Sequence, residues 1–182
     1  MKMLIFSDSH GDVETMRGIV NKEKPDMIFH LGDCITDAKQ LNEEYPDIQM
    51  VNVLGNVDSD NEDEEWVKLV EIRGKRFMIT HGHTFISYAF MNEFNEYRQT
   101  DENRATSRIS MLKSMTDNNA DILLHGHTHE PCISSIPTPE RNCWIMNPGS
   151  IRYISGSAVK PTYGILIINE SGSLGWQILE VE

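Results

Sequence analysis

The chain has 182 residues, and we expect residues 1–182 to form a single domain with its own hydrophobic core. Hydrophobic residues make up 39% and charged residues 24%, as is typical of soluble globular proteins. The formal net charge of -12 repels nucleic-acid phosphates and argues against general DNA or RNA binding, although bound dications could still attract a small anionic substrate.

The first 54 residues alternate short apolar runs with amphipathic segments. Strands are predicted at 3–6, 26–30 and 49–54. Asp12 is placed to cap a first helix, and Thr36 or Asp37 to cap a second, because each precedes apolar residues at helical spacing. The alternation of strand and helix predicts a parallel sheet with right-handed crossovers.

The rest of the chain is rich in predicted strands. Two of them, at 66–72 and 76–80, flank the hairpin turn Arg73-Gly74-Lys75. A helix is predicted at about 101–117 with Ile109 among its core-facing residues. Further strands are predicted at 121–124, 132–136, 143–147, 163–169 and 174–181. We therefore expect a second sheet packed on the first.

The cysteines and the beginning of the chain indicate a cytoplasmic location. Cys34, Cys132 and Cys143 are odd in number and lack CxxC spacing, which argues against a disulfide framework or a structural zinc site. The apolar run 3–6 is too short for a signal peptide, and no run is long enough to cross a membrane.

Five short segments contain residues that commonly bind metal ions, and most follow directly on an apolar run. In chain order they are Asp8-Ser9-His10, Gly32-Asp33, Gly55-Asn56, His81-Gly82 and Gly126-His127-Thr128-His129. Ligands at the ends of neighbouring strands converge on one place. Seven ligands are too many for one catalytic ion but suit two ions that share a carboxylate.

The mixture of carboxylate, imidazole and amide oxygen suits dications of intermediate softness. Asp8 and His10 are two residues apart and can chelate one ion. Asp33 can bridge with its two carboxylate oxygens, and the neutral amide of Asn56 limits the negative charge. Each segment alone has a simpler interpretation, because Asp-Ser-His could cap a helix and Gly-Asp and Gly-Asn are common turns. The complete set in this order favours a metal centre.

The ordered pattern D-x-H, G-D, G-N, H and G-H-x-H resembles that of calcineurin-like metallophosphoesterases, in particular the short YfcE-like phosphodiesterase group. The pattern spans residues 8–129, and 147–150 (Asn-Pro-Gly-Ser) is similar to a later family segment beside the site. The resemblance implies a four-layer α/β/β/α sandwich of two mixed β-sheets flanked by helices. It also implies a centre of two metal ions at the strand ends.

The resemblance further implies how the ligands are shared. One ion would be held by Asp8, His10, Asp33 and His129, and the other by Asp33, Asn56, His81 and His127. Similar proteins use manganese, iron, zinc or nickel; we expect manganese to support activity, although this ligand set does not choose among them. Similar proteins often form homo-oligomers, and the sequence leaves the oligomeric state open.

The implied function is hydrolysis of a small phosphodiester, with a hydroxide bridging the two metals for in-line attack on phosphorus. Asp33, Asn56 and His81 are the ligands for which the resemblance implies a catalytic role. One alternative is a phosphatase acting on monoesters, nucleotides or phosphoproteins. Another is a non-catalytic scaffold like the retromer subunit of the same fold, against which the complete set of histidines argues.

Three residues near the motifs bear on whether the leaving group can receive a proton. Many relatives have histidine after the motif asparagine, whereas Val57 cannot donate a proton, so leaving groups that depart unaided, such as aryl alcohols, should be favoured. Asp58 is expected to orient a histidine ligand or to shape the turn. His83 could donate a proton to the leaving group, but a structural role is the favoured interpretation. The aromatic stretch 85–98 is read as core packing, a substrate-facing lid or an oligomer contact.

Overall fold

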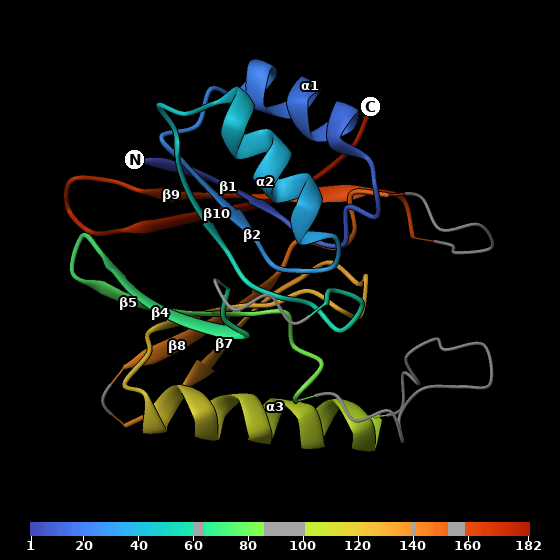
Figure 1. The fold of residues 1–182 in the computed structure, drawn as a ribbon. Helices are drawn as coiled ribbons and strands as arrows, with labels where there is room; N and C mark the ends of the chain where they lie inside the picture. Colours follow the sequence, from blue (N-terminus) through green and yellow to red (C-terminus); the bar gives the residue numbers. More distant parts are fainter. Residues whose placement is uncertain (60–63, 86–100, 140, 153–158) are drawn as a thin grey trace.

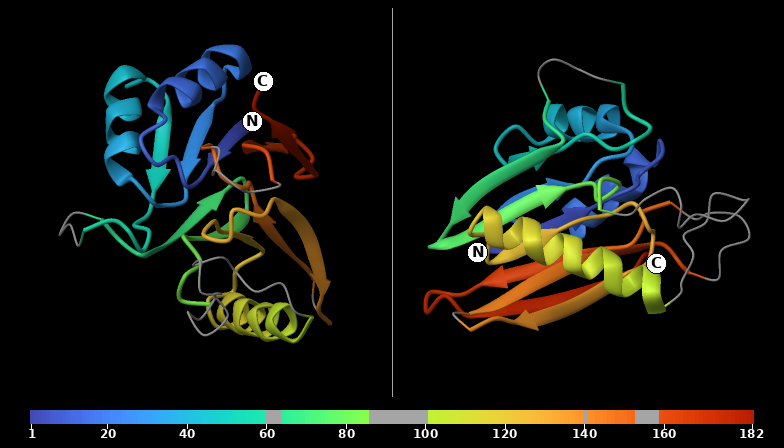
Figure 2. Two further views of the ribbon diagram at one scale, coloured as in Figure 1. Left: turned by 90° about the vertical axis from the view of Figure 1, so that its right-hand side faces the viewer. Right: turned by 90° about the horizontal axis from the view of Figure 1, so that it is seen from below.

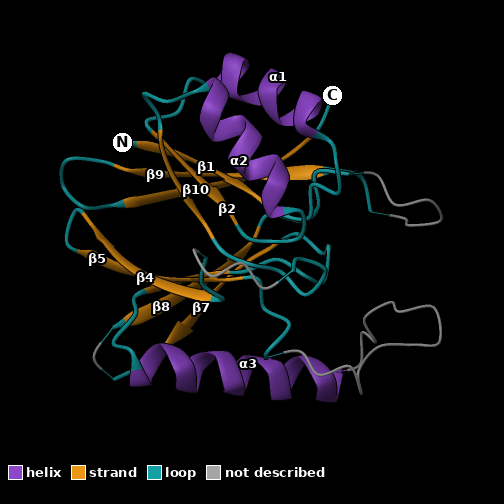
Figure 3. Ribbon diagram, in the orientation of Figure 1, coloured by secondary structure: helices purple, strands orange, loops and turns teal. Residues whose placement is uncertain are grey.

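The alternating pattern produces two five-stranded sheets that lie face to face between helices (Figures 1 and 3). The structure is a computed structural model, and it describes residues 1–59, 64–85, 101–139, 141–152 and 159–182. The first sheet has the order β10-β9-β1-β2-β3 and the second β4-β5-β6-β8-β7. The predicted α/β/β/α sandwich of two mixed sheets is confirmed.

The bounds of the elements follow the predicted runs closely. The first sheet contains β1 (Lys2–Phe6), β2 (Met27–His30), β3 (Gln49–Asn52), β9 (Thr162–Ile168) and β10 (Leu174–Glu180). The second contains β4 (Val67–Ile72), β5 (Lys75–Thr80), β6 (Ile122–Leu124), β7 (Cys132–Pro137) and β8 (Asn142–Asn147). The helices are α1 (Val13–Glu23), α2 (Ile35–Glu44) and α3 (Asp101–Asp117). None of the described helices is both long and apolar enough to span a membrane.

Each sheet contains three neighbouring parallel strands, at one side of the first sheet and in the middle of the second. Strands β1, β2 and β3 are parallel to one another, and so are β5, β6 and β8. Strands β9 and β10 extend the first sheet in antiparallel pairing, so the β-rich second half of the chain builds the second sheet and also adds two strands to the first. The chain thus returns to its first strand at its end, a long-range pairing that local patterns do not predict.

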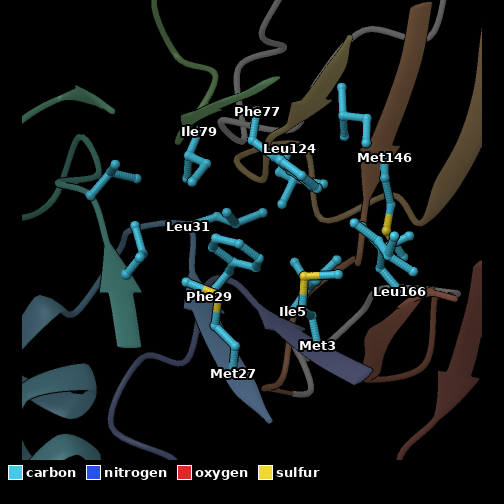
Figure 4. Packing of buried hydrophobic residues seen from close by; sticks show 14 residues of the cluster. Met3, Ile5, Met27, Phe29, Leu31, Phe77, Ile79, Leu124, Met146 and Leu166 are labelled. Atoms are coloured by element: carbon cyan, nitrogen blue, oxygen red, sulfur yellow. The ribbon is translucent and has the colours of Figure 1, made fainter. Parts of the chain in front are cut away.

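The space between the two sheets is filled by apolar side chains (Figure 4). Met3, Ile5 and Phe29 of the first sheet meet Phe77 and Leu124 of the second, and all are fully buried. The Phe29 and Phe77 rings stack with centroids 5.9 Å apart and an interplanar angle of 21°. This packing holds the strand ends of the two sheets in a fixed relation.

Helices α1 and α2 cover the outer face of the first sheet, and α3 covers that of the second (Figure 2). Asp12 caps α1 as predicted, because its Oδ1 accepts the Thr15 N–H at 3.1 Å. The predicted cap of α2 is wrong. The helix begins at Ile35, Cys34 occupies the cap position without a side-chain hydrogen bond, and Asp37 bonds to the loop after β1 instead.

Helix α3 has the predicted bounds, but the predicted inward position of Ile109 is wrong. Ile109 is 69% exposed, whereas Met111 and Met115 pack on the second sheet. Residues two positions apart on a helix lie on nearly opposite sides, so a helix turned toward the methionines turns Ile109 away. Of the stretch 85–98, all but Phe85 lies outside the described residues, and Phe85 is half-buried against the core cluster that includes Met111 and Met115 of α3.

The turn between β4 and β5 lies in the predicted segment but is one residue shorter than predicted, because Lys75 belongs to β5. Ile72 pairs with Lys75, which leaves Arg73 and Gly74 as the two turn residues. Both have positive φ angles, 50° and 72°, as the two central residues of a type I′ hairpin turn require.

Truncation of the core between the sheets should be costly. We expect Phe29→Ala to lower the free energy of unfolding by about 3–5 kcal/mol, because it removes a fully buried ring and leaves a cavity. The control Ile167→Ala, at an exposed position of β9, should cost about 0.5 kcal/mol. Urea denaturation measures both, and equal losses would contradict this account of the core.

Candidate metal centre

All seven candidate ligands lie just beyond the carboxyl ends of parallel strands. Asp8 and His10 follow β1, Asp33 follows β2, Asn56 follows β3, His81 follows β5, and His127 and His129 follow β6. Because parallel strands end at the same edge of a sheet, each sheet presents its candidate ligands at one edge. A hydrogen bond between Asp8 and His127 joins the two edges.

Backbone hydrogen bonds lock these loops to one another. The Asp8 N–H donates to the Gly32 carbonyl at 3.1 Å, and the Gly126 N–H donates to the His81 carbonyl at 2.8 Å. Across the two sheets, the His127 N–H donates to Asp8 Oδ2 at 3.2 Å. The candidate ligands are therefore held by a rigid frame.

Two motif glycines allow this close approach. A Cβ atom at Gly55 would overlap the Asp33 carboxylate, and one at Gly126 would overlap the Ser7 hydroxyl and crowd Asp8. Neither glycine is explained by a positive φ angle. Glycine is needed at these two positions because a carboxylate or a hydroxyl lies where a side chain would begin.

The backbone is strained at most of the candidate ligands. Positive φ angles occur at Asp8 (54°), His10 (45°), Asp33 (60°), His127 (69°) and His129 (57°). A left-handed conformation costs a residue other than glycine roughly 1–2 kcal/mol. Such strain persists only where the surrounding structure enforces it, and it commonly marks functional sites.

A first group of candidate ligands consists of Asp8, His10 and His129, whose ligand atoms lie within 4.8 Å of one another. Asp8 Oδ1 lies 3.0 Å from His129 Nε2. Asp8 Oδ2 accepts hydrogen bonds from the Ser7 hydroxyl at 2.5 Å and from the His127 N–H. Oδ1 is therefore the oxygen that faces the imidazoles. Ser7 carries no motif signal and was missed by sequence reasoning.

A second group consists of Asp8, Asp33 and His81, also with ligand atoms within 4.8 Å of one another. His81 Nε2 lies 3.3 Å from Asp33 Oδ1 and 3.8 Å from Asp8 Oδ1. The other ring nitrogen, Nδ1, is 2.8 Å from the Leu31 carbonyl, to which it can only donate. Asp8 is the carboxylate shared by the two groups, and bridging by Asp33 stays a prediction.

The pKa values of these groups reflect how close the two carboxylates lie to the imidazole. Burial alone would lower the pKa of His81, but the carboxylates of Asp8 and Asp33 outweigh it and raise that pKa to about 8. Burial alone would raise the pKa of both carboxyl groups, yet the neighbouring histidines, above all His81, hold each below its usual value. This buried group of side chains therefore favours two ionised carboxylates with positive charge beside them.

Asn56 and His127 complete the predicted set. The buried Oδ1 of Asn56 has no hydrogen-bond partner among the described residues. The ring of His127 meets that of His81 edge to face, with centroids 5.2 Å apart. Burial lowers the pKa of His127 to about 4, so its imidazole is neutral, the form that binds metals. His10 and His129 form the corresponding ring pair of the first group, at 5.7 Å.

Asp58 does not orient a histidine, contrary to the first expectation. Its carboxylate accepts three backbone N–H groups, from Asp33 at 3.0 Å, Ile35 at 2.8 Å and Gly55 at 2.8 Å. The turn after Asn56 directs the carboxylate into these backbone donors. Asp58 thereby joins the loops that carry Asp33 and Asn56.

Sequence reasoning missed a buried polar network under the first group. The Ser9 hydroxyl lies 2.7 Å from Asp37 Oδ2 and 3.0 Å from His30 Nε2, and the Gly11 N–H donates to Asp37 at 2.7 Å. Ser150, in the segment expected beside the site, donates from its hydroxyl to the Asp8 carbonyl at 2.9 Å. These groups hold the Asp8–His10 turn in its left-handed conformation.

The chain belongs to the calcineurin-like phosphoesterase superfamily, whose domain model matches residues 1–171. It is 25% identical to a probable metallophosphoesterase of Mycoplasma pneumoniae over 89% of this chain and 86% of the relative. It is 25% identical to a phosphodiesterase of Methanocaldococcus jannaschii over 91% of this chain and 92% of the relative. The fold matches Vps29 of Entamoeba histolytica complexed with zinc, with a TM-score of 0.64 and 19% identity over the whole of both chains.

A side chain at Gly55 should disturb the centre. We expect Gly55→Ala to lower the free energy of unfolding by about 1–3 kcal/mol, because the methyl group would overlap the Asp33 carboxylate. The matched control Gly18→Ala, in α1 with open space around it, should instead stabilise by about 0.5–1 kcal/mol. Thermal and urea unfolding test this pair, and a neutral Gly55→Ala would contradict the close packing described here.

Proposed function

We propose that this protein is a phosphodiesterase that holds two divalent metal ions among the seven candidate ligands. One observation carries the proposal: buried His81 Nε2 lies 3.3 Å from Asp33 Oδ1 and 3.8 Å from Asp8 Oδ1, and both carboxylates are buried as well. When Nδ1 of His81 donates to the Leu31 carbonyl in the neutral ring, Nε2 is an acceptor that faces two other acceptors. A cation among them satisfies all three.

The donor atoms fit two dications of the transition-metal type. The proposed ligands of one ion are Asp8, His10, Asp33 and His129, and those of the other are Asp33, Asn56, His81 and His127. The buried Oδ1 of Asn56 and Nε2 of His81 have no hydrogen-bond partner within the part of the chain that the structure describes, and a ligated ion would satisfy both atoms. Mixed oxygen and imidazole donors suit manganese, iron, zinc or nickel, and we propose manganese for activity.

Bound at these residues, two dications would activate water as the nucleophile and neutralise charge on the phosphoryl oxygens. Within the chain, Asp33 would be a ligand of both ions, while Asn56 and His81 would be ligands of the second ion. The Leu31 carbonyl fixes the ring of His81, and Asp58 fixes the loop of Asp33, so both enter the reaction pre-oriented. Such preorganisation avoids rearrangement during attack on phosphorus.

A diester fits this chain better than a monoester for an electrostatic reason. The net charge of -12 opposes a dianionic phosphomonoester more strongly than a singly charged diester. The name of the M. jannaschii relative supports the same substrate class. Val57, after Asn56, cannot donate a proton, which favours aryl leaving groups. The likeness to Vps29 concerns the fold alone.

The decisive variant for this proposal is Asp33→Asn. It should abolish hydrolysis of bis(p-nitrophenyl) phosphate, with a fall of at least roughly 10³-fold, because a carboxylate shared by both ions is lost. The control Asp47→Asn makes the same change of charge at an exposed position and should leave the rate unchanged.

The assay uses chelated protein to which manganese has been restored, with p-nitrophenyl phosphate as the monoester in parallel. Substantial diester turnover by metal-replete Asp33→Asn would refute the assigned role of Asp33. A faster monoester reaction would indicate a phosphatase. Absence of both reactions in the wild-type protein, with metal bound, would indicate a scaffold.

His83→Ala tests whether this histidine serves as the acid. His83 is half-buried between the rings of Trp66 and His127, and its buried Nδ1 has no hydrogen-bond partner among the described residues. We expect a structural role, so the variant should slow aryl and alkyl diesters by equal factors. A selective loss for alkyl diesters, measured as the ratio of kcat/KM values, would instead assign proton donation to His83.

A further inference from the structure

We propose that Trp66 forms an aromatic subsite beside the metal centre, which receives a planar ring carried by the substrate. This inference rests on the proposed function and deepens it by naming a substrate class: a singly charged phosphodiester with an aryl or nucleobase ring on one side. It is carried by the position of Trp66, by its ring contacts and by its exposure.

Strand pairing places Trp66 near a candidate ligand. Val67 of β4 and Thr80 of β5 form the last pair of their ladder, and Trp66 and His81 are the next residues beyond that pair. The Glu65 carbonyl accepts the Leu54 N–H at 3.0 Å. This bond ties the segment before Trp66 to the loop that leads to Asn56.

A chain of aromatic rings connects Trp66 to the second group of candidate ligands. The indole meets the ring of His83 at 67° with centroids 5.1 Å apart. His83 in turn lies 5.7 Å from the ring of His81 and 6.2 Å from that of His127. One imidazole therefore separates the indole from two candidate metal ligands.

The exposure of Trp66 distinguishes it from the other two tryptophans. Trp144 and Trp176 stack on each other at 5.7 Å and pack against the core between the sheets. Trp66 is 36% exposed, and Val57, whose N–H donates to Asp33 Oδ1 at 3.2 Å, is 57% exposed. Two apolar side chains thus remain open to solvent beside the candidate ligands, where a substrate group can cover them.

The charge of the protein restricts which ring-bearing substrates fit. A net charge of -12 disfavours long polyanions such as nucleic-acid strands. A diester of a single phosphate carries one negative charge for the metal ions and a neutral ring for the indole. Stacking of a ring on an aromatic side chain does not require a positive patch on the protein.

The test measures binding rather than turnover. Calorimetry on the manganese-loaded protein compares phenylphosphonate with methylphosphonate, which share the metal-binding group and differ in the ring. We expect phenylphosphonate to bind wild-type protein roughly tenfold more tightly, the order that stacking on an aromatic side chain supplies. The ratio of the two Kd values should fall to about one in Trp66→Ala and persist in Trp66→Phe.

The control Leu69→Ala removes an exposed apolar side chain from the other face of β4 and should keep the ratio of the two Kd values.

The phosphonate isostere of adenosine monophosphate is a third ligand. Tighter binding than that of phenylphosphonate would indicate a nucleobase, and equal binding would indicate an aryl group. A ratio near one in wild-type protein overturns the inference. So does a ratio that Trp66→Ala leaves unchanged, including the case in which both ligands weaken alike.

Turnover of bis(p-nitrophenyl) phosphate by the same preparation separates this inference from the proposed function. Ring-selective binding that depends on Trp66, without turnover, refutes the phosphodiesterase activity alone. Turnover with a Kd ratio that does not depend on Trp66 refutes the aromatic subsite alone.

Discussion

The structure depends on the burial of two carboxylates, Asp8 and Asp33, beside the same imidazole, that of His81. Buried like charges repel strongly at short distance, so positive charge has to lie among them. Protonated His81 can supply it in the apoprotein, and a metal ion can supply it when bound. The loops around the centre use their backbone and polar side chains to keep these groups together.

The fold offsets the backbone strain that this arrangement imposes. Five candidate ligands have left-handed backbone conformations, and the loops that bear them approach so closely that glycine is required at positions 55 and 126. The core between the sheets, in which Phe29 stacks on Phe77, offsets that strain. Rigidity of this kind suits a centre whose ligands come from five separate loops, because each ligand is placed before any ion arrives.

Local patterns in the sequence were sufficient to predict the strands, the helices and the places of the seven candidate residues after strands; that these residues bind metal ions stays a prediction. These patterns did not predict which sheet receives β9 and β10, since antiparallel pairing with β1 joins residues more than 150 positions apart. The local patterns also did not predict the directions in which side chains point. Ile109 is exposed because α3 turns its methionines to the sheet, and Asp58 binds backbone N–H groups rather than a histidine. Ser7 donates to the carboxylate of the adjacent Asp8, and the Trp66 ring contacts that of His83, but nothing in their own segments marks either residue.

The most direct test of the central claim is anomalous diffraction from crystals of the protein loaded with manganese. The account predicts two peaks roughly 3.5–4 Å apart among the seven candidate ligands, with His81 Nε2 directed at one of them. A single peak there, no peak, or manganese bound only elsewhere on the acidic surface would contradict it.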